Sequence, residues 1–294
     1  MSWASKFSDP YRIDHGKKFR LRDFDPGHTG HLRSKEHAQE LLDKGIANMR
    51  ELQDKLYAQG QWAVLIILQA MDAAGKDGVI KHVMSGVNPQ GCQVYSFKQP
   101  SQEELNHDYL WRANLKLPER GHIGIFNRSY YEEVLVVRVH SDILKHERIP
   151  QELVGKDIWQ DRFDDIVNYE RYLTHNGIAI RKFFLNVSKK EQKRRFMARL
   201  DTPEKNWKFS AGDVREREYW DEYMMAFEEM IAATSKKHAP WYVVPADNKW
   251  YTRLVVAAAI VDAMEELDLS YPRVDPEQRK QLAAARNELE SKKG

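Results

Sequence analysis

One stretch of the 294-residue chain decides the fold, namely Ala63-Val-Leu-Ile-Ile-Leu-Gln-Ala-Met-Asp-Ala-Ala-Gly-Lys76-Asp-Gly78-Val-Ile-Lys81. An apolar run typical of a buried strand leads into a loop of small residues and then into a helix. Backbone N–H groups of such a loop converge on phosphate oxygens, the helix N-terminus adds positive potential, and the lysine supplies a mobile charge. The stretch therefore predicts a phosphate-binding loop.

The loop departs from the common pattern Gly-x-x-x-x-Gly-Lys-Ser/Thr. Ala70 stands at the first glycine position, Asp72 lies within the loop, and Asp77 replaces the hydroxyl residue that binds magnesium. The alternative interpretation is an ordinary strand-to-helix turn, in which a lysine at the start of the helix would serve little purpose. A loop built differently indicates a phosphate donor different from the usual nucleotide.

Composition indicates a globular protein with a sizeable core, because 42% of the residues are hydrophobic and 8 Trp, 13 Tyr and 11 Phe are among them. The formal net charge of +2 does not indicate a nucleic-acid partner. A single cysteine, Cys92, excludes an intramolecular disulfide, and the longest apolar runs, at 62–68 and 254–260, are too short to cross a bilayer. We therefore expect a cytoplasmic protein without a membrane partner.

Short apolar runs predict five strands, with helical patterns between them, at 62–69, 94–97, 123–126, 178–185 and 241–245. Strands that alternate with helices form a parallel sheet covered on both faces. We therefore predict one α/β domain over 1–294 with three α/β/α layers, a five-stranded parallel sheet, an N-terminal arm (1–34) and a helical lid (about 187–220).

Two helix starts carry capping signals. Ser34 precedes apolar residues at helical spacing, which predicts a long helix over 34–59. Ser101-Gln-Glu-Glu104 matches a capping box, which predicts a helix through about Lys116.

A second candidate group follows the apolar run at 123–126, in the sequence Phe126-Asn-Arg-Ser-Tyr-Tyr-Glu-Glu133. Phosphotransferases usually carry an acidic residue here that holds magnesium, whereas this chain has the neutral Asn127. Arg128 beside it is suited to bidentate contact with phosphate, or it could pair with a carboxylate as a structural residue. Glu132 and Glu133 could either stabilise the helix dipole or belong to the acceptor site.

A third feature is the basic segment from Arg181 to Arg217, in which Lys and Arg far outnumber Asp and Glu. Arg195 and Arg199 are spaced i, i+4 and so share a helix face, and Lys205 and Lys208 flank Trp207. Such a charge run can be a solvated face. Downstream of a phosphate-binding loop, however, it favours a lid over a polyanion.

Together these motifs resemble the polyphosphate kinase 2 family. The matching blocks are Met71-Asp-Ala-Ala-Gly-Lys-Asp-Gly78 (Walker A), Phe97-Lys-Gln-Pro-Ser, Leu110-Trp-Arg112, Phe126-Asn-Arg-Ser-Tyr-Tyr131 (Walker B), Asp201-Thr-Pro-Glu-Lys-Asn-Trp-Lys208 (lid) and Ala239-Pro-Trp-Tyr-Val-Val-Pro-Ala-Asp-Asn-Lys-Trp250. The resemblance implies a P-loop kinase fold, transfer of a phosphoryl group from inorganic polyphosphate to a nucleotide with Mg²⁺ or Mn²⁺, and a homodimer or homotetramer.

One departure from the family pattern is informative. Many members have Asp-Arg-Ser at Walker B, whereas this chain has Asn127-Arg128-Ser129. The variant resembles the class III branch, which phosphorylates both AMP and ADP. It leaves open whether Asn127 binds metal, so that Asp72 and a glutamate would carry more of the charge.

The leading hypothesis is therefore a reversible polyphosphate-dependent kinase of AMP and ADP, with guanine nucleotides as further acceptors. An ATP-dependent nucleoside monophosphate kinase and a non-catalytic polyphosphate-binding module are the alternatives. The expected catalytic residues are Asp72 (also the metal ligand), Lys76, Asn127 and Arg128. The expected phosphate-binding residues are Ala73, Ala74, Gly75, Lys76, Asp77, Gly78, Lys81, Arg128, Arg195, Arg199, Lys205 and Lys208. The expected nucleotide-binding residues are Arg112, Asn127, Tyr131, Glu132 and Glu133.

Overall fold

The apolar runs form neighbouring parallel strands in the computed structural model, which describes residues 2–30, 32, 34–208 and 210–291. The central strand β2 pairs in parallel with β4 and β5, β4 pairs with β3, and β5 pairs with β6. All five predicted strands are confirmed, with the bounds Ala63–Gln69 (β2), Cys92–Ser96 (β3), Ile123–Asn127 (β4), Ile178–Asn186 (β5) and Trp241–Pro245 (β6).

The sheet of the described residues has six strands in the order β1-β6-β5-β2-β4-β3, so the prediction of five parallel strands was wrong by one. The additional strand, β1 (Arg12–Ile13), comes from the N-terminal arm and pairs antiparallel with β6. The arm also contains α1 (Trp3–Ser8) and the 3₁₀ helices η1 (Asp9–Tyr11) and η2 (Leu21–Asp23). A two-residue strand is too short to show any alternation of apolar and polar residues.

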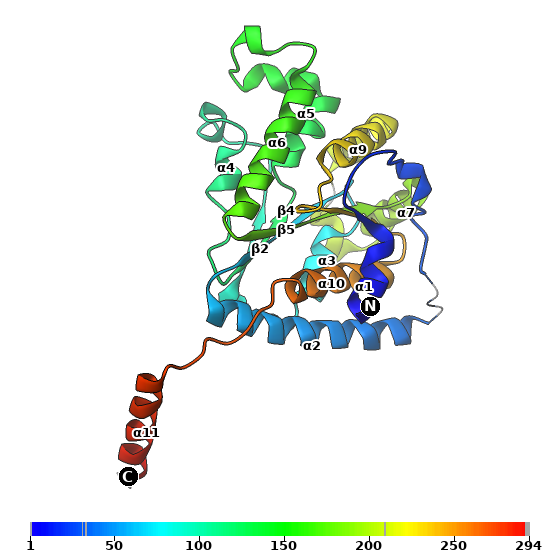
Figure 1. Ribbon diagram of the computed structural model, residues 1–294. Coiled ribbons are helices and arrows are strands. Elements are labelled where there is room, and N and C mark those ends of the chain that lie inside the picture. The colour runs from blue at the N-terminus through cyan, green and yellow to red at the C-terminus, as the bar shows by residue number, and fades with distance from the viewer. Residues whose placement is uncertain (1, 31, 33, 209, 292–294) are drawn as a thin grey trace.

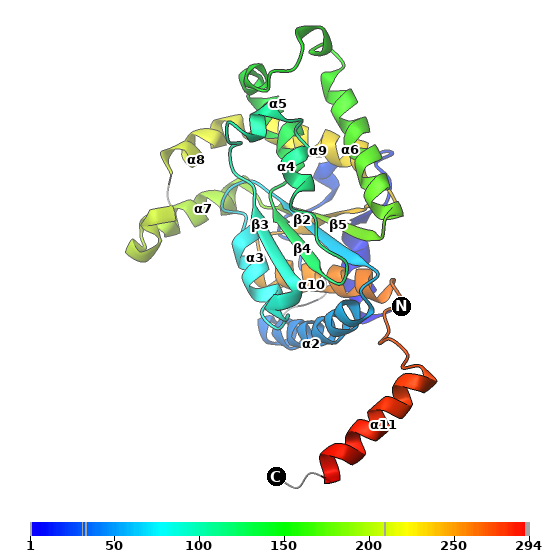
Figure 2. The ribbon, with the colours of Figure 1, turned by 90° about the vertical axis from the view of Figure 1, so that its left-hand side faces the viewer.

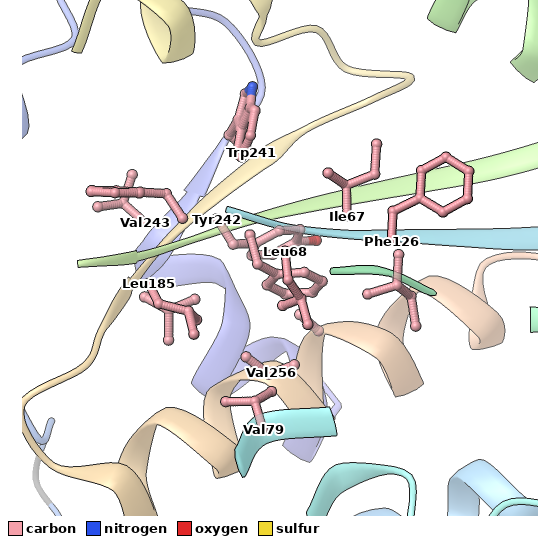
Figure 3. Close-up of a cluster of buried hydrophobic side chains, with 14 of the residues drawn as sticks. Ile67, Leu68, Val79, Phe126, Leu185, Trp241, Tyr242, Val243 and Val256 are labelled. Atoms are coloured by element: carbon pink, nitrogen blue, oxygen red, sulfur yellow. The ribbon is translucent and has the colours of Figure 1, made fainter. Parts of the chain in front are cut away.

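Helices cover both faces of the sheet, as predicted for three layers (Figure 1). One face packs against α3 (Lys76–Val83) and α10 (Lys249–Glu265), with α1 and α2 (Lys35–Gln59) packed against α10. On the other face lie α6 (Ile158–His175) and α9 (Trp220–Thr234). Figure 3 shows the core between these layers, with Val79 of α3 and Val256 of α10 on the side of the sheet opposite Trp241.

Both capping signals form their hydrogen bonds, but only the first begins a long helix. Ser34 Oγ accepts a hydrogen bond from the His37 N–H, and α2 runs from Lys35 to Gln59 as predicted. The capping box at Ser101 also forms, because the Ser101 N–H donates to Glu104 Oε2 (2.7 Å) and the Glu104 N–H donates to Ser101 Oγ (3.2 Å).

The helix expected through Lys116 is nevertheless wrong. Only η4 (Glu104–Asn106) and α4 (Trp111–Asn114) form there. Asp108 Oδ1 accepts from the Leu110 N–H, and such a local side-chain bond competes with helix continuation.

The segment expected as a lid is helical. It comprises α7 (Lys189–Leu200), η8 (Pro203–Lys208), α8 (Ala211–Arg215) and η9 (Glu216–Tyr219). Figure 2 shows α7 and α8 projecting from the body. Its closure over a ligand stays a prediction.

The remaining helices are short, apart from the last. They are η3 (Pro89–Gly91), η5 (Tyr130–Val134), α5 (Val136–Val139), η6 (Ser141–His146), η7 (Gln151–Leu153) and the exposed C-terminal α11 (Pro276–Ser291), which lies away from the body (Figures 1 and 2). In the described ranges, no helix has the length and apolar character needed to cross a membrane.

A fully buried ion pair lies in the core between β5, α6 and the end of α9. Lys182 Nζ of β5 donates to Glu170 Oε2 (2.6 Å), to the Thr234 carbonyl (2.9 Å) and to the Tyr131 hydroxyl (3.0 Å). Glu170 Oε1 accepts from the hydroxyls of Tyr130 (2.9 Å) and Tyr131 (2.7 Å). Every charged atom of the pair is thus hydrogen-bonded, which is the condition under which a buried pair is tolerated.

We expect Lys182→Met to lower the free energy of unfolding by about 3–5 kcal/mol, because it leaves the Glu170 charge buried without its partner. The double variant Lys182→Met/Glu170→Gln should recover most of that loss, since no charge then remains in the core. Urea denaturation followed by circular dichroism measures both. Equal losses in the single and double variants would contradict this account.

Candidate active site

The loop between β2 and α3 wraps around a lysine. Ala73 and Gly75 have φ angles of +62° and +113°, in the left-handed region, and they turn the chain back toward the start of α3. Lys76 Nζ donates to the Ala70 carbonyl at 2.9 Å, so the ammonium group lies within the turn. Burial lowers the pKa of Lys76, and Asp72 opposes that shift. The loop lies beyond the carboxyl end of a central strand, where open α/β sheets bind ligands.

The end of β4 contacts this loop twice. Arg128 Nη2 lies 2.6 Å from Asp72 Oδ1, and Asn127 Nδ2 donates to Asp77 Oδ1 at 3.0 Å. The structure thus brings the expected catalytic residues Asp72, Lys76, Asn127 and Arg128 together. The interpretation of Arg128 as the partner of a carboxylate is confirmed by Asp72. Because 37% of the Arg128 side chain is exposed to the cavities described below, its contact with phosphate stays a prediction.

A cleft of about 750 Å³ opens above the loop and is termed the basic cleft here. Its lining includes the loop residues Ala73, Ala74, Gly75 and Gly78. Its acidic residues are Asp72, Asp77 and Asp213, and its cationic residues are Lys76, Lys98, Arg128, Arg194, Arg195, Arg199, Lys249 and Arg253. Such a large excess of cationic over acidic residues around a phosphate-binding loop is suited to a polyanion.

Sequence reasoning did not assign four of these cations, Lys98, Arg194, Lys249 and Arg253, to the site individually, although Arg194 lies in the basic segment from Arg181 to Arg217. They come from the end of β3, from α7 and from α10, and they share no local motif. Only the topology of the sheet brings these elements to one cleft. Lys249 within the block at 239–250 offered one usable signal, since it lies just after the predicted strand at 241–245.

A second pocket of about 480 Å³ adjoins the basic cleft, and both are lined by Phe97, Lys98 and Arg128. Its other walls are partly apolar and include Leu105, Val136, Val137 and Ile143, and they also carry the predicted nucleotide residues Arg112, Glu132 and Glu133. The two cavities therefore meet at Arg128.

Arg112 and Glu133 are buried charged residues of the second pocket. Arg112 Nη1 donates to the Lys98 carbonyl (2.7 Å), and its Nη2 lies 3.4 Å from Glu133 Oε1. Burial, together with the nearby Glu147 carboxylate, raises the pKa of Glu133 to about 7. Burial also raises the pKa of Glu132, while Arg128 and Lys76 oppose that shift. Glu132 is thus electrostatically coupled to the residues of the loop.

The expected contact between Tyr131 and a nucleotide is wrong. Tyr131 is fully buried, its hydroxyl bonds to Glu170 and Lys182, and it lines neither cavity. The 3₁₀ turn that follows Ser129 directs this ring into the core, and spacing along the sequence could not reveal that.

Arg195 is committed to the protein backbone, in contrast to the expectation that it grips the polymer. Its guanidinium donates to the carbonyls of Ala73 (3.1 Å), Ala74 (2.5 Å) and Ala246 (2.5 Å), and to Glu191 Oε1 (2.8 Å). It therefore ties α7 and the end of β6 to the phosphate loop. Arg199, one turn further on, lines the same cleft and stacks on the Phe196 ring at 5.5 Å.

Three of the expected phosphate-binding lysines are not placed at the site. Lys81 is exposed on α3 and does not line the basic cleft. Lys205 and Lys208 belong to η8, and their side chains lie outside what the structure describes.

The donor set fits a magnesium ion whose coordination the substrate completes. The described residues hold no group of three or more His, Cys, Asp or Glu that could surround a metal ion. Asp72 lies close enough to Glu132 and Asp213 to act electrostatically on both carboxylates. In phosphoryl-transfer sites Mg²⁺ is typically bound by one or two carboxylates together with substrate phosphates, and Asp72 with one acidic neighbour supplies that.

The fold and the site define a P-loop kinase-like phosphotransferase. Three comparisons with known proteins make the assignment narrower. The family model described as Polyphosphate kinase 2 (PPK2) matches residues 32–271. A protein of Rhodopseudomonas palustris named ADP-polyphosphate phosphotransferase is 54% identical over 280 residues, which are 95% of this chain and 97% of that protein.

A Meiothermus ruber protein named AMP/ADP-polyphosphate phosphotransferase is 45% identical over 264 residues, 90% of this chain and 95% of that protein. The crystal structure of Polyphosphate Kinase 2 from Arthrobacter aurescens TC1 superposes with a TM-score of 0.86 at 40% identity, covering 97% of this chain and 99% of that one. The chain belongs to the polyphosphate kinase 2 family.

We expect Arg195→Met and Arg199→Met to differ in their effect on stability. Arg195→Met should lower the free energy of unfolding by about 3 kcal/mol, because it removes charged hydrogen bonds to buried carbonyls. Arg199→Met should cost less than about 0.5 kcal/mol, as is usual for a residue without such bonds. Both should weaken the binding of tripolyphosphate. Urea denaturation and titration calorimetry measure these effects, and equal destabilisation by the two substitutions would contradict the role assigned to Arg195.

Proposed function

We propose that this protein transfers phosphoryl groups reversibly from inorganic polyphosphate to AMP and ADP, giving ADP and ATP, with guanine nucleotides as further acceptors. The observation that carries the proposal is the pair of cavities that meet at Arg128: in one, Lys and Arg outnumber Asp, and the other is partly apolar and contains Arg112. A bare phosphate chain suits the first, and a nucleotide with an aromatic base suits the second. The names of the two relatives, which specify polyphosphate with ADP or with AMP and ADP, support the same pairing.

Phosphoryl transfer requires mainly positioning and neutralisation of charge. In this proposal the terminal phosphate of the polymer lies between Lys76 and Arg128, and the acceptor phosphate approaches Arg128 from the second pocket. Asp72 would hold Mg²⁺ or Mn²⁺, whose charge offsets the charge that develops on the transferred group. Asn127 orients Asp77 through its amide and adds no negative charge beside the incoming phosphates.

Asp72 has two functions in this arrangement. Before substrate binds, its carboxylate holds Arg128 in place at 2.6 Å. When phosphate oxygens replace Asp72 as the partner of the Arg128 guanidinium, the Asp72 carboxylate becomes available to a cation. The homodimer or homotetramer implied by the resemblance and the cytoplasmic location expected from the composition remain predictions. Light scattering of the purified chain measures the oligomeric state.

We expect Lys76→Ala and Asp72→Asn each to abolish ATP formation from polyphosphate and ADP, because each removes a charge that positions the transferred group. Both variants should remain folded, since both side chains line the cleft and neither belongs to the hydrophobic core. ATP release is measured with luciferase, and folding with circular dichroism. Turnover at the wild-type rate by either variant would refute the assignment.

A nucleotide panel tests donor and acceptor together. With long-chain polyphosphate and Mg²⁺, AMP should yield ADP, ADP should yield ATP, and GMP and GDP should give the corresponding guanine products, as read by chromatography. If ATP phosphorylated AMP as fast as polyphosphate does, the chain would instead be a nucleoside monophosphate kinase. Polyphosphate of unchanged length after incubation with every nucleotide would indicate a non-catalytic binding module.

A further inference from the structure

Two cations on α10 line the basic cleft beyond the phosphate loop. Lys249 is exposed and Arg253 is half-buried, and their i, i+4 spacing places them about 5–6 Å apart on one helix face. Neither side chain makes an ion pair or a hydrogen bond within the described ranges of the chain. Arg194 and Arg195, which line the same cleft, both pair with Glu191.

The position of this pair is electrostatically unfavourable in the free protein. Lys249 is the first residue of α10, where the helix dipole is positive, and the first turn of α10 contains no acidic residue. Burial lowers the pKa of Lys249, and Arg195, Arg194 and Arg253 lower it further, against an opposing effect of Glu191. Like charges placed together at a helix N-terminus are stabilised when an anion binds between them.

The two cations extend the cleft away from the reaction centre. Lys249 lies near Arg195, which holds the phosphate loop. Arg253 acts electrostatically on His82, whose pKa is lowered first by burial and then by this arginine. His82 lies six residues after Lys76 on α3, about 9 Å along the helix axis. Because α3 and α10 pack side by side (Figure 1), a chain passing from Lys249 to Arg253 moves away from Lys76.

We propose that Lys249 and Arg253 form a remote subsite for polyphosphate, which binds phosphates several units away from the one that is transferred. The inference rests on the proposed function and adds selection for chain length to it. A long polymer reaches both cations while its end lies at Lys76, whereas tripolyphosphate fills the loop without reaching Arg253. Contacts made equally in the ground state and the transition state lower KM and leave kcat unchanged.

The test compares long-chain polyphosphate with tripolyphosphate, with Mg²⁺ and saturating ADP. The double variant Lys249→Met/Arg253→Met should raise KM per chain for the long polymer about tenfold, as expected for the loss of charged contacts. Its kcat should stay within about twofold of wild type, by the same argument of uniform binding. For tripolyphosphate, the KM (where it serves as substrate) or the inhibition constant (where it acts as competitive inhibitor) should be unchanged. The matched control, Lys190→Met/Lys193→Met, removes two charges from exposed positions of α7 outside the cleft and should behave as wild type.

Several outcomes would overturn the subsite. An equal rise in KM for long-chain polyphosphate and for tripolyphosphate would place the two cations at the reaction centre. An unchanged KM for the long polymer would show that the polymer does not bind to these two residues. The same rise in the control variant would reduce the effect to the general field of the protein. Failure of the wild type to form ATP would refute the proposed function alone. The subsite would still be tested by calorimetric dissociation constants for the two polyphosphates, measured without nucleotide.

Discussion

The structure depends on the central position of β2. All seven residues of this strand, Ala63–Gln69, are buried, and it is hydrogen-bonded in parallel to β4 on one side and to β5 on the other. Because these strands run in the same direction, their carboxyl ends lie at one edge of the sheet. That edge receives the loop from β2, Asn127 and Arg128 from β4, and the start of α7 after β5. The covered sheet thus fixes the backbone from which the side chains of the site extend.

The parts that sequence predicted are those fixed by local patterns. An apolar run followed by small residues and Lys76 defined the loop, and short apolar runs defined the five parallel strands. The pairing of Arg128 with Asp72 was not predicted, although both residues follow neighbouring parallel strands, whose carboxyl ends meet at one edge of the sheet. The two-residue strand β1 and the break after the Ser101 capping box did not follow, because the first is ordered by β6 and the second by a local bond of Asp108.

The same limit applies to the role of each side chain. Arg195 and Arg199 are equivalent on a helical wheel, and only the tertiary structure shows that the first is bound by carbonyls of Ala73 and Ala74. Pairing is what separates structural charges from charges that await a ligand in this molecule. Lys182 is completely buried and completely hydrogen-bonded, whereas Lys249 and Arg253 line a cleft without partners in the described residues. Sequence gives the charge of a residue, but its partners are known only from the fold.

Arg128 shows how the free protein prepares its site. Its φ of +65° lies in the left-handed region, which costs a non-glycine residue about 1–2 kcal/mol. The strain is held by the N–H bond to the Leu68 carbonyl and by the ion pair with Asp72, both of which join β4 to β2. The guanidinium therefore stands at the junction of the two cavities before any substrate arrives. In the proposed reaction, phosphates from the two sides would only have to replace Asp72 as its partner, so that little reorganisation would be required when donor and acceptor meet.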